Sequence, residues 1–143
     1  MAHPEVKGQW AMFDQVGFSV SSAERSIPFY EACLAPLGLR IIERQPELRA
    51  VIFAGKEEFP FLWIGEGDGF FHGVRIEVGK CPCHYAFLAS SREAVHAFYR
   101  AGLAHGGRDN GAPEAGRGGY YGAFLLDPDG NNIEATFRET PAR

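Results

Sequence analysis

The sequence predicts an α+β fold in which two tandem βαβββ modules form one small domain. Residues 15–38 and 84–107 align without a gap at an offset of 69 and are identical at ten of 24 positions, which indicates an internal duplication. Three further runs with strand character follow each copy. The repeat and these runs together predict modules at about 12–65 and 82–138 of a single domain of 143 residues.

Strands are expected where short runs alternate between two faces and are rich in β-branched or aromatic residues. In the first half these runs are Phe13–Val20, Leu39–Glu43, Arg49–Ala54 and Pro60–Ile64. In the second half they are Cys83–Ala89, a weak Gly107–Gly111 stretch, Tyr120–Leu126 and Asn132–Phe137. Asp127-Pro128-Asp129-Gly130 predicts a type I turn between the last two runs. The glycine-rich join at 65–80 has room for an extra strand at Val74–Val78.

A helix is expected after the first strand of each copy, because an apolar stripe with helical spacing follows it. A capping box, in which a serine hydroxyl and a glutamate satisfy free backbone N–H groups, marks each helix start. The two boxes are Ser21-x-x-Glu24 and Ser90-x-x-Glu93. Gly38 and Gly107 mark the helix ends. Pro28 predicts a kink or a late start of the first helix.

Composition limits the classes of partner and compartment. The net charge is −4 and there is no basic stripe, which argues against nucleic acid. No apolar run reaches 18 residues, so no membrane span is expected. Three cysteines, Cys33, Cys81 and Cys83, without a secretory signal predict free thiols and a cytoplasmic location. Cys81-Pro82-Cys83-His84 is similar to a zinc knuckle, but two free thiols are the better interpretation, because no second cysteine pair exists.

The alternation of the strands places three strong polar side chains on the face that is not covered by helix. Gln15, His84 and Glu134 each interrupt an apolar pattern on that inferred face. Gln15 and His84 are equivalent in the repeat, so a two-fold related fold would bring them face to face. Two structural interpretations remain open, a hydrogen-bonded His84 in the sheet and a solvated Glu134.

The sequence resembles the vicinal oxygen chelate superfamily, which includes glyoxalase I, bleomycin-resistance proteins and extradiol dioxygenases. The resemblance covers roughly residues 12–138 and rests on FDQVGFSV, SIPFYEACLAPLG, HYAFLAS and YYGAFLLDPDGNNIEA. It implies a pseudo-two-fold, cup-shaped mixed sheet with helices outside. It also implies a divalent metal at the base of the cup that binds vicinal oxygens of the substrate.

The resemblance implies four ligand places, on the first and last strand of each module. They hold Gln15, His84, Glu134 and an apolar fourth residue, Leu62 or Trp63. The first three would hold a divalent ion of Zn, Mn, Mg, Ni or Fe, with Glu134 also as the catalytic carboxylate. The apolar fourth place argues against glyoxalase-type isomerisation, and Gln15 in place of His argues against extradiol cleavage.

Two function classes therefore remain open. The first is a metal-assisted lyase, transferase or dioxygenase that acts on a small oxygenated molecule. The second is a protein that sequesters an aromatic or cationic small molecule without turnover. In either class the expected substrate-binding residues are Trp63, Arg117, Tyr120 and Tyr121. A homodimer is expected from the resemblance.

Overall fold

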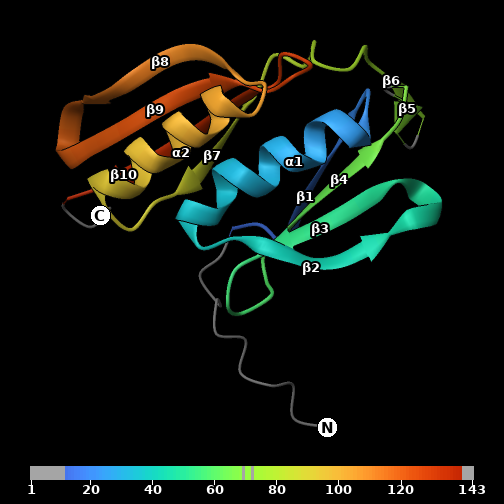
Figure 1. Ribbon diagram of the computed structural model, residues 1–143, viewed down its shortest axis with the longest axis horizontal. Coiled ribbons are helices and arrows are strands. Elements are labelled where there is room, and N and C mark those ends of the chain that lie inside the picture. The colour runs from blue at the N-terminus through green and yellow to red at the C-terminus, as the bar shows by residue number, and fades with distance from the viewer. Residues whose placement is uncertain (1–11, 69, 72, 140–143) are drawn as a thin grey trace, which may run out of the picture.

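The computed structural model describes residues 12–68, 70–71 and 73–139, and it contains two βαβββ modules (Figure 1). The first module consists of β1 Gln15–Val20, α1 Ala23–Leu34, β2 Arg40–Gln45, β3 Ala50–Ala54 and β4 Phe61–Glu66. The second consists of β7 His84–Leu88, α2 Arg92–Ala104, β8 Arg108–Ala115, β9 Tyr120–Leu126 and β10 Asn132–Arg138. Short strands β5 Phe70–Phe71 and β6 Val74–Arg75 pair within the join. The predicted two-module α+β fold is confirmed.

Each module forms its own four-stranded mixed sheet. The strand orders are β1-β4-β3-β2 and β7-β10-β9-β8, so the two sheets have the same topology. The first strand of each module runs parallel to the last, and the other neighbours are antiparallel. The duplication seen in the sequence is therefore a duplication of the complete sheet.

One hydrophobic core joins the two modules on the helix side of both sheets. Figure 1 shows α1 and α2 next to each other, with the first sheet on the α1 side and the second on the α2 side. Phe18 of β1 and Tyr85 of β7 stack with ring centroids 4.7 Å apart. Phe29 of α1 and Phe98 of α2 are fully buried in the same core. Residues that alternate with these on β1 and β7 therefore point away from the core.

The turn between β9 and β10 connects the second module to α1 through a buried carboxylate. Asp127 is fully buried, and its Oδ2 accepts from the Tyr30 hydroxyl at 2.5 Å. Its Oδ1 accepts from the backbone N–H groups of Asp129 at 2.9 Å and Asn131 at 2.8 Å. Gly130 N donates to Asp127 O at 2.9 Å, as a type I turn requires. Burial, and after it the charge of Asp127, raise the pKa of the Tyr30 hydroxyl.

Both helices begin one residue later than the capping boxes predict. Ser22 and Ser91 are the N-caps, and they accept from Arg25 N and Ala94 N. Ser21 is engaged elsewhere, because its N–H and its hydroxyl both donate to the Asp129 carboxylate. A contact between residues 108 positions apart in the sequence thus occupies the Ser21 side chain.

Two further details of the elements differ from the sequence-based expectations. α1 starts at Ala23, before Pro28, and continues through it. The weak stretch after α2 is the eight-residue strand β8, which extends beyond the predicted end at Gly111. Within the described residues, neither α1 nor α2 has the length and apolar character needed to cross a bilayer.

The two equivalent tyrosines of the repeat allow a matched test of the link between modules. Tyr30→Phe removes a buried donor to a carboxylate, so we expect a loss of about 1.5–3 kcal/mol in the free energy of unfolding. Tyr99 donates to Asp109 at the surface, and Tyr99→Phe is expected to change stability much less. Urea unfolding of both variants measures this difference. Equal losses of stability in the two variants would show that the Tyr30–Asp127 hydrogen bond stabilises the fold no more than a surface hydrogen bond does.

Candidate active site

A polar group lies on the outer face of the second sheet, opposite the helices. The parallel register pairs Asn132 with His84 and Glu134 with Ala86, so His84, Glu134 and Thr136 share this face. The facing inferred from the sequence thus agrees with the register. The Glu134 side chain is only 6% exposed, whereas that of His84 is 55% exposed. The Glu134 carboxylate is therefore nearly buried, whereas the His84 imidazole beside it is exposed to solvent.

The two carboxylate oxygens of Glu134 have different partners. Oε1 accepts from the Tyr120 hydroxyl at 2.5 Å and from the Thr136 hydroxyl at 2.8 Å. Oε2 lies 3.3 Å from His84 Nε2. The two hydroxyls fix the orientation of the carboxylate, and they direct its second oxygen toward the imidazole.

A glycine gives the Tyr120 ring its place beside Glu134. Tyr120 and Gly122 are two residues apart on β9, so they lie on the same face of the strand. A Cβ at Gly122 would overlap the Tyr120 hydroxyl. The ring therefore lies along the strand, and its hydroxyl reaches the neighbouring strand β10. Burial, and after it the hydrogen bond to Glu134, raise the pKa of the Tyr120 hydroxyl to about 12.

The corresponding place in the first sheet holds Trp63. Gln15 pairs with Phe61 as His84 pairs with Asn132, so the residue two further along β4, Trp63, corresponds to Glu134. Leu62 pairs with Val16 and lies on the core side. The Trp63 ring lies over Gly65, and its Nε1 donates to Gln45 Oε1 at 2.9 Å. Of the two residues that the sequence leaves open, Trp63 is the one on the outer face.

Gln15 and His84 occupy equivalent places, at the starts of β1 and β7. Gln15 is exposed, and its amide donates to the neighbouring Asp14 at 3.3 Å. Gln15 and His84 lie on the sides of β1 and β7 that face away from Phe18 and Tyr85, and these two rings meet in the core. The local alternation predicts each facing separately, but it contains no information on how the modules are oriented.

The other expected binding residues divide between the two sides of the sheet. Tyr120 is on the outer face, whereas Tyr121 is buried on the helix side, where its hydroxyl lies 2.7 Å from His96 Nε2. The guanidinium carbon of Arg92 lies 4.4 Å from the centre of the Tyr121 ring. Arg117 is exposed in the turn before β9. The structure thus brings Tyr120 to Glu134 and does not bring Tyr121 there.

Among the described His, Cys, Asp and Glu side chains around Glu134, two lie together as possible metal ligands. In the described part of the chain, no group of three or more His, Cys, Asp and Glu side chains could hold a metal ion. His84 Nε2 and Glu134 Oε2 are two suitable ligand atoms with the right chemistry for a divalent ion. The residues present therefore fit two of the three protein ligands that such a site normally uses.

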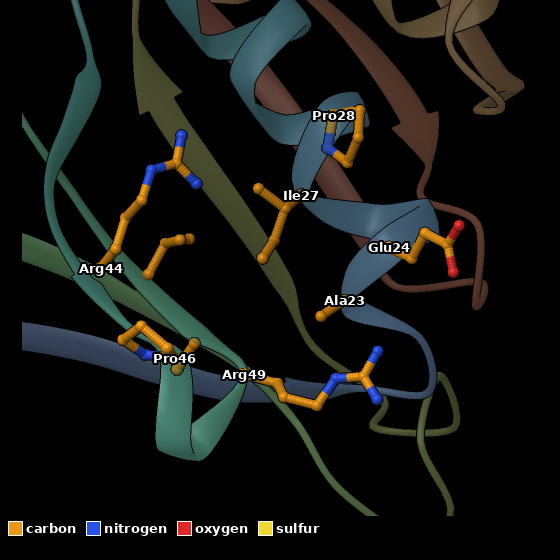
Figure 2. A pocket seen from close by; sticks show the side chains of 9 residues that line it. Ala23, Glu24, Ile27, Pro28, Arg44, Pro46 and Arg49 are labelled. Carbon is orange, nitrogen blue, oxygen red and sulfur yellow. The ribbon is translucent and has the colours of Figure 1, made fainter.

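A pocket of about 500 Å³ lies elsewhere, between α1 and the β2–β3 hairpin (Figure 2). Ile27 and Pro28 line it from the helix, and the side chains of Arg44 and Arg49 extend at its opposite side. Both arginines have carboxylate partners at 3.3 Å, Glu31 and Glu66 respectively. This pocket contains none of the residues around Glu134, so it is separate from the candidate site.

Thr136 and Gly122 are site residues that the sequence reasoning did not select. Thr136 was detectable, because it alternates with Glu134 along the last strand. The spacing aromatic-x-Gly occurs at Tyr120–Gly122 and again at Trp63–Gly65, and in both places the ring lies over the glycine. The same spacing at Phe53–Gly55 has its ring in the core, so it indicates an outer-face ring only together with the facing of the strand.

The fold and the site define a two-module α+β protein with a carboxylate–imidazole pair on an outer sheet face. The family model of the Glyoxalase/Bleomycin resistance protein/Dioxygenase superfamily matches residues 12–135. The chain belongs to this superfamily. No curated protein gives a significant match.

Solved structures with this fold cover nearly the whole chain. A glyoxalase/bleomycin resistance protein from Albidiferax ferrireducens is 28% identical, with a TM-score of 0.73 over 90% of this chain and 100% of that one. A glyoxalase/bleomycin resistance protein/dioxygenase family enzyme from Burkholderia phytofirmans is 18% identical, with a TM-score of 0.69 over 87% and 97%. Lactoylglutathione lyase from Agrobacterium tumefaciens is 16% identical, with a TM-score of 0.62 over 89% and 93%. The last two matches show the fold alone.

The placement of Tyr120 is testable through Gly122. In Gly122→Ala the new methyl group displaces the Tyr120 hydroxyl from Glu134, so we expect the pKa of Tyr120 to fall from about 12 toward its ordinary value of about 10. NMR of the tyrosine Cζ in labelled protein measures the pKa, and Tyr120→Phe assigns the signal. Gly55→Ala is the control, because φ is not positive there and the new methyl group would make only an ordinary contact with Leu39 at 3.8 Å. An unchanged pKa in Gly122→Ala would contradict the placement.

Proposed function

We propose that the face around Glu134 binds a small oxygenated molecule with the help of a divalent metal ion, in a lyase, transferase or dioxygenase reaction. The observation that carries the proposal is the approach of His84 Nε2 to Glu134 Oε2 at 3.3 Å, with Oε1 held by Tyr120 and Thr136. Outer hydrogen bonds of this kind orient carboxylates that ligate metals. Membership of the superfamily supports the same interpretation.

His84 and Glu134 would hold the ion, and a third ligand would come from Gln15. A bound divalent ion supplies Lewis-acid polarisation of substrate oxygens. Glu134 is the proposed catalytic carboxylate, since a carboxylate can accept a proton and this one is already oriented by two donors. Tyr120 keeps its own proton at neutral pH, because its pKa is about 12, and it holds Glu134 in place.

The third ligand is proposed to come from the partner subunit of a homodimer. Three features support a second copy. Leu88, on the same side of β7 as His84, is 77% exposed, and Met12 and Phe13, just before Gln15, are 84% and 55% exposed. Among the described strands, β1 and β7 are each the edge strand of their sheet. A dimer that covers these edges would place Gln15 of the partner subunit near Glu134. A cytoplasmic location belongs to the same proposal.

A second candidate function is metal-free binding of an aromatic or cationic molecule. Trp63 favours it, because an indole occupies the place that corresponds to Glu134 in the repeat. In this case Glu134 would supply the negative charge, while Trp63, Tyr120 and the exposed Arg117 would line the ligand.

Metal titration distinguishes the two functions. We expect Zn²⁺, Mn²⁺, Ni²⁺, Mg²⁺ or Fe²⁺ to raise the melting temperature, and we expect His84→Ala and Glu134→Gln to weaken affinity by about 10–100-fold or more in calorimetry. His105→Ala is the matched control, because the His105 imidazole lies at the end of α2, where its Nδ1 bonds to Ala101 O, and its loss should leave the affinity unchanged. Gln15→His should tighten binding about tenfold, since imidazole is a better ligand than a neutral amide.

The outcome that rejects the metal is equally clear. If no ion shifts the melting temperature of the wild type, the metal-assisted function fails and the metal-free candidate remains. Quenching of tryptophan fluorescence by cationic aromatic compounds, compared between the wild type and Trp63→Phe, then tests that candidate. An unchanged response in Trp63→Phe would reject it as well.

A further inference from the structure

Two exposed cysteines lie side by side just before β7. The Sγ atoms of Cys81 and Cys83 are 3.3 Å apart, and both residues are exposed. Pro82 between them fixes one backbone dihedral and restricts Cys81 to extended conformations. The two sulfur atoms are therefore held near each other by the local backbone, and small molecules in solvent can reach them.

The position of this dithiol is set by its surroundings on both sides. Upstream, Gly79 has a positive φ of 81° and packs directly on the backbone carbonyl of Asp129, in the turn that anchors the modules. Downstream, Tyr85 hydrogen-bonds to Cys83 and stacks on Phe18 in the core. The segment between these contacts is short, which limits how far the sulfur atoms can separate.

The contact between the two thiols determines what they can do. Their Sγ atoms lie within hydrogen-bond distance of each other, and either thiol can be the donor. The thiolate is the nucleophile in thiol chemistry, so the sulfur that loses its proton attacks and the other sulfur resolves.

We propose that Cys81 and Cys83 form a reversible thiol–disulfide site that is oxidised by low-molecular-weight disulfides of the glutathione class. In the first step, one Sγ of the pair attacks one sulfur of oxidised glutathione as the thiolate, a mixed disulfide forms, and one glutathione thiolate leaves. In the second step, the other cysteine loses its proton and attacks the Sγ of the mixed disulfide, and the second glutathione leaves as a thiolate. The dithiol is oxidised to one intrachain disulfide, and one glutathione disulfide is reduced to two thiols.

The third cysteine is an internal reference for this chemistry. Cys33 is fully buried in α1, and burial raises the pKa of its thiol. An inaccessible, protonated thiol does not react with a small disulfide. The proposal therefore distinguishes the three cysteines of one chain in a single experiment, and it is independent of whether the protein binds a metal.

The test uses the full-length protein with oxidised glutathione, followed by alkylation and peptide mass spectrometry. In the wild type we expect Cys81 and Cys83 to lose their reactivity together, with no added glutathione, while Cys33 stays free, and we expect reduced glutathione to reverse the change. Cys81→Ser and Cys83→Ser should each accumulate a glutathione adduct on the remaining cysteine of the pair, because the second thiol that would displace glutathione is absent.

Several results would overturn the proposal. Stable adducts on both cysteines of the wild type, disulfides between chains, or no reaction would each reject the intrachain site. Thermal unfolding of each variant checks its fold, and the wild-type peptide map remains decisive if a variant does not fold.

Discussion

The buried carboxylate of Asp127 is the constraint on which the arrangement of the two modules depends. A fully buried charge is costly unless hydrogen bonds compensate it. Here the turn supplies backbone donors from its own module, and Tyr30 supplies a hydroxyl from the other. Ser21 and Arg25 of the first module also bind Asp129, which follows Asp127 by two residues in the same turn. The turn thus fixes α1, and with it the core between the sheets.

The candidate site depends on this arrangement indirectly. Phe18 and Tyr85 stack in the core, so Gln15 and His84 lie on the sides of β1 and β7 that face away from it. The second sheet holds Glu134 with its own residues, Tyr120 and Thr136, whereas the first sheet has Trp63 at the corresponding place. Of the three proposed metal ligands, the second sheet carries two and the first carries Gln15.

Local pattern predicts the elements and the facing of their side chains, and it fails where distant contacts decide. The repeat and the strand alternation are sufficient for two modules and for the shared face of His84 and Glu134. They cannot separate Tyr120 from Tyr121, because both are adjacent aromatic residues in a strand with two partly apolar faces. Ser21 has the sequence of an N-cap, but Asp129, far along the chain, binds it. The residue at the fourth ligand place can be identified only from the strand register, because the offset between equivalent residues of the two modules is 69 at the first strand and 71 at the last.

The correspondence of Trp63 with Glu134 has a consequence for how the two halves have diverged. Two identical modules would present two identical faces, and every substitution would act twice. In this chain one copy has an ionisable group at the central position of its last strand, and the other has an indole there. The two halves can therefore be changed separately: a substitution at Glu134 alters the charge of the second sheet, and a substitution at Trp63 alters the aromatic surface of the first.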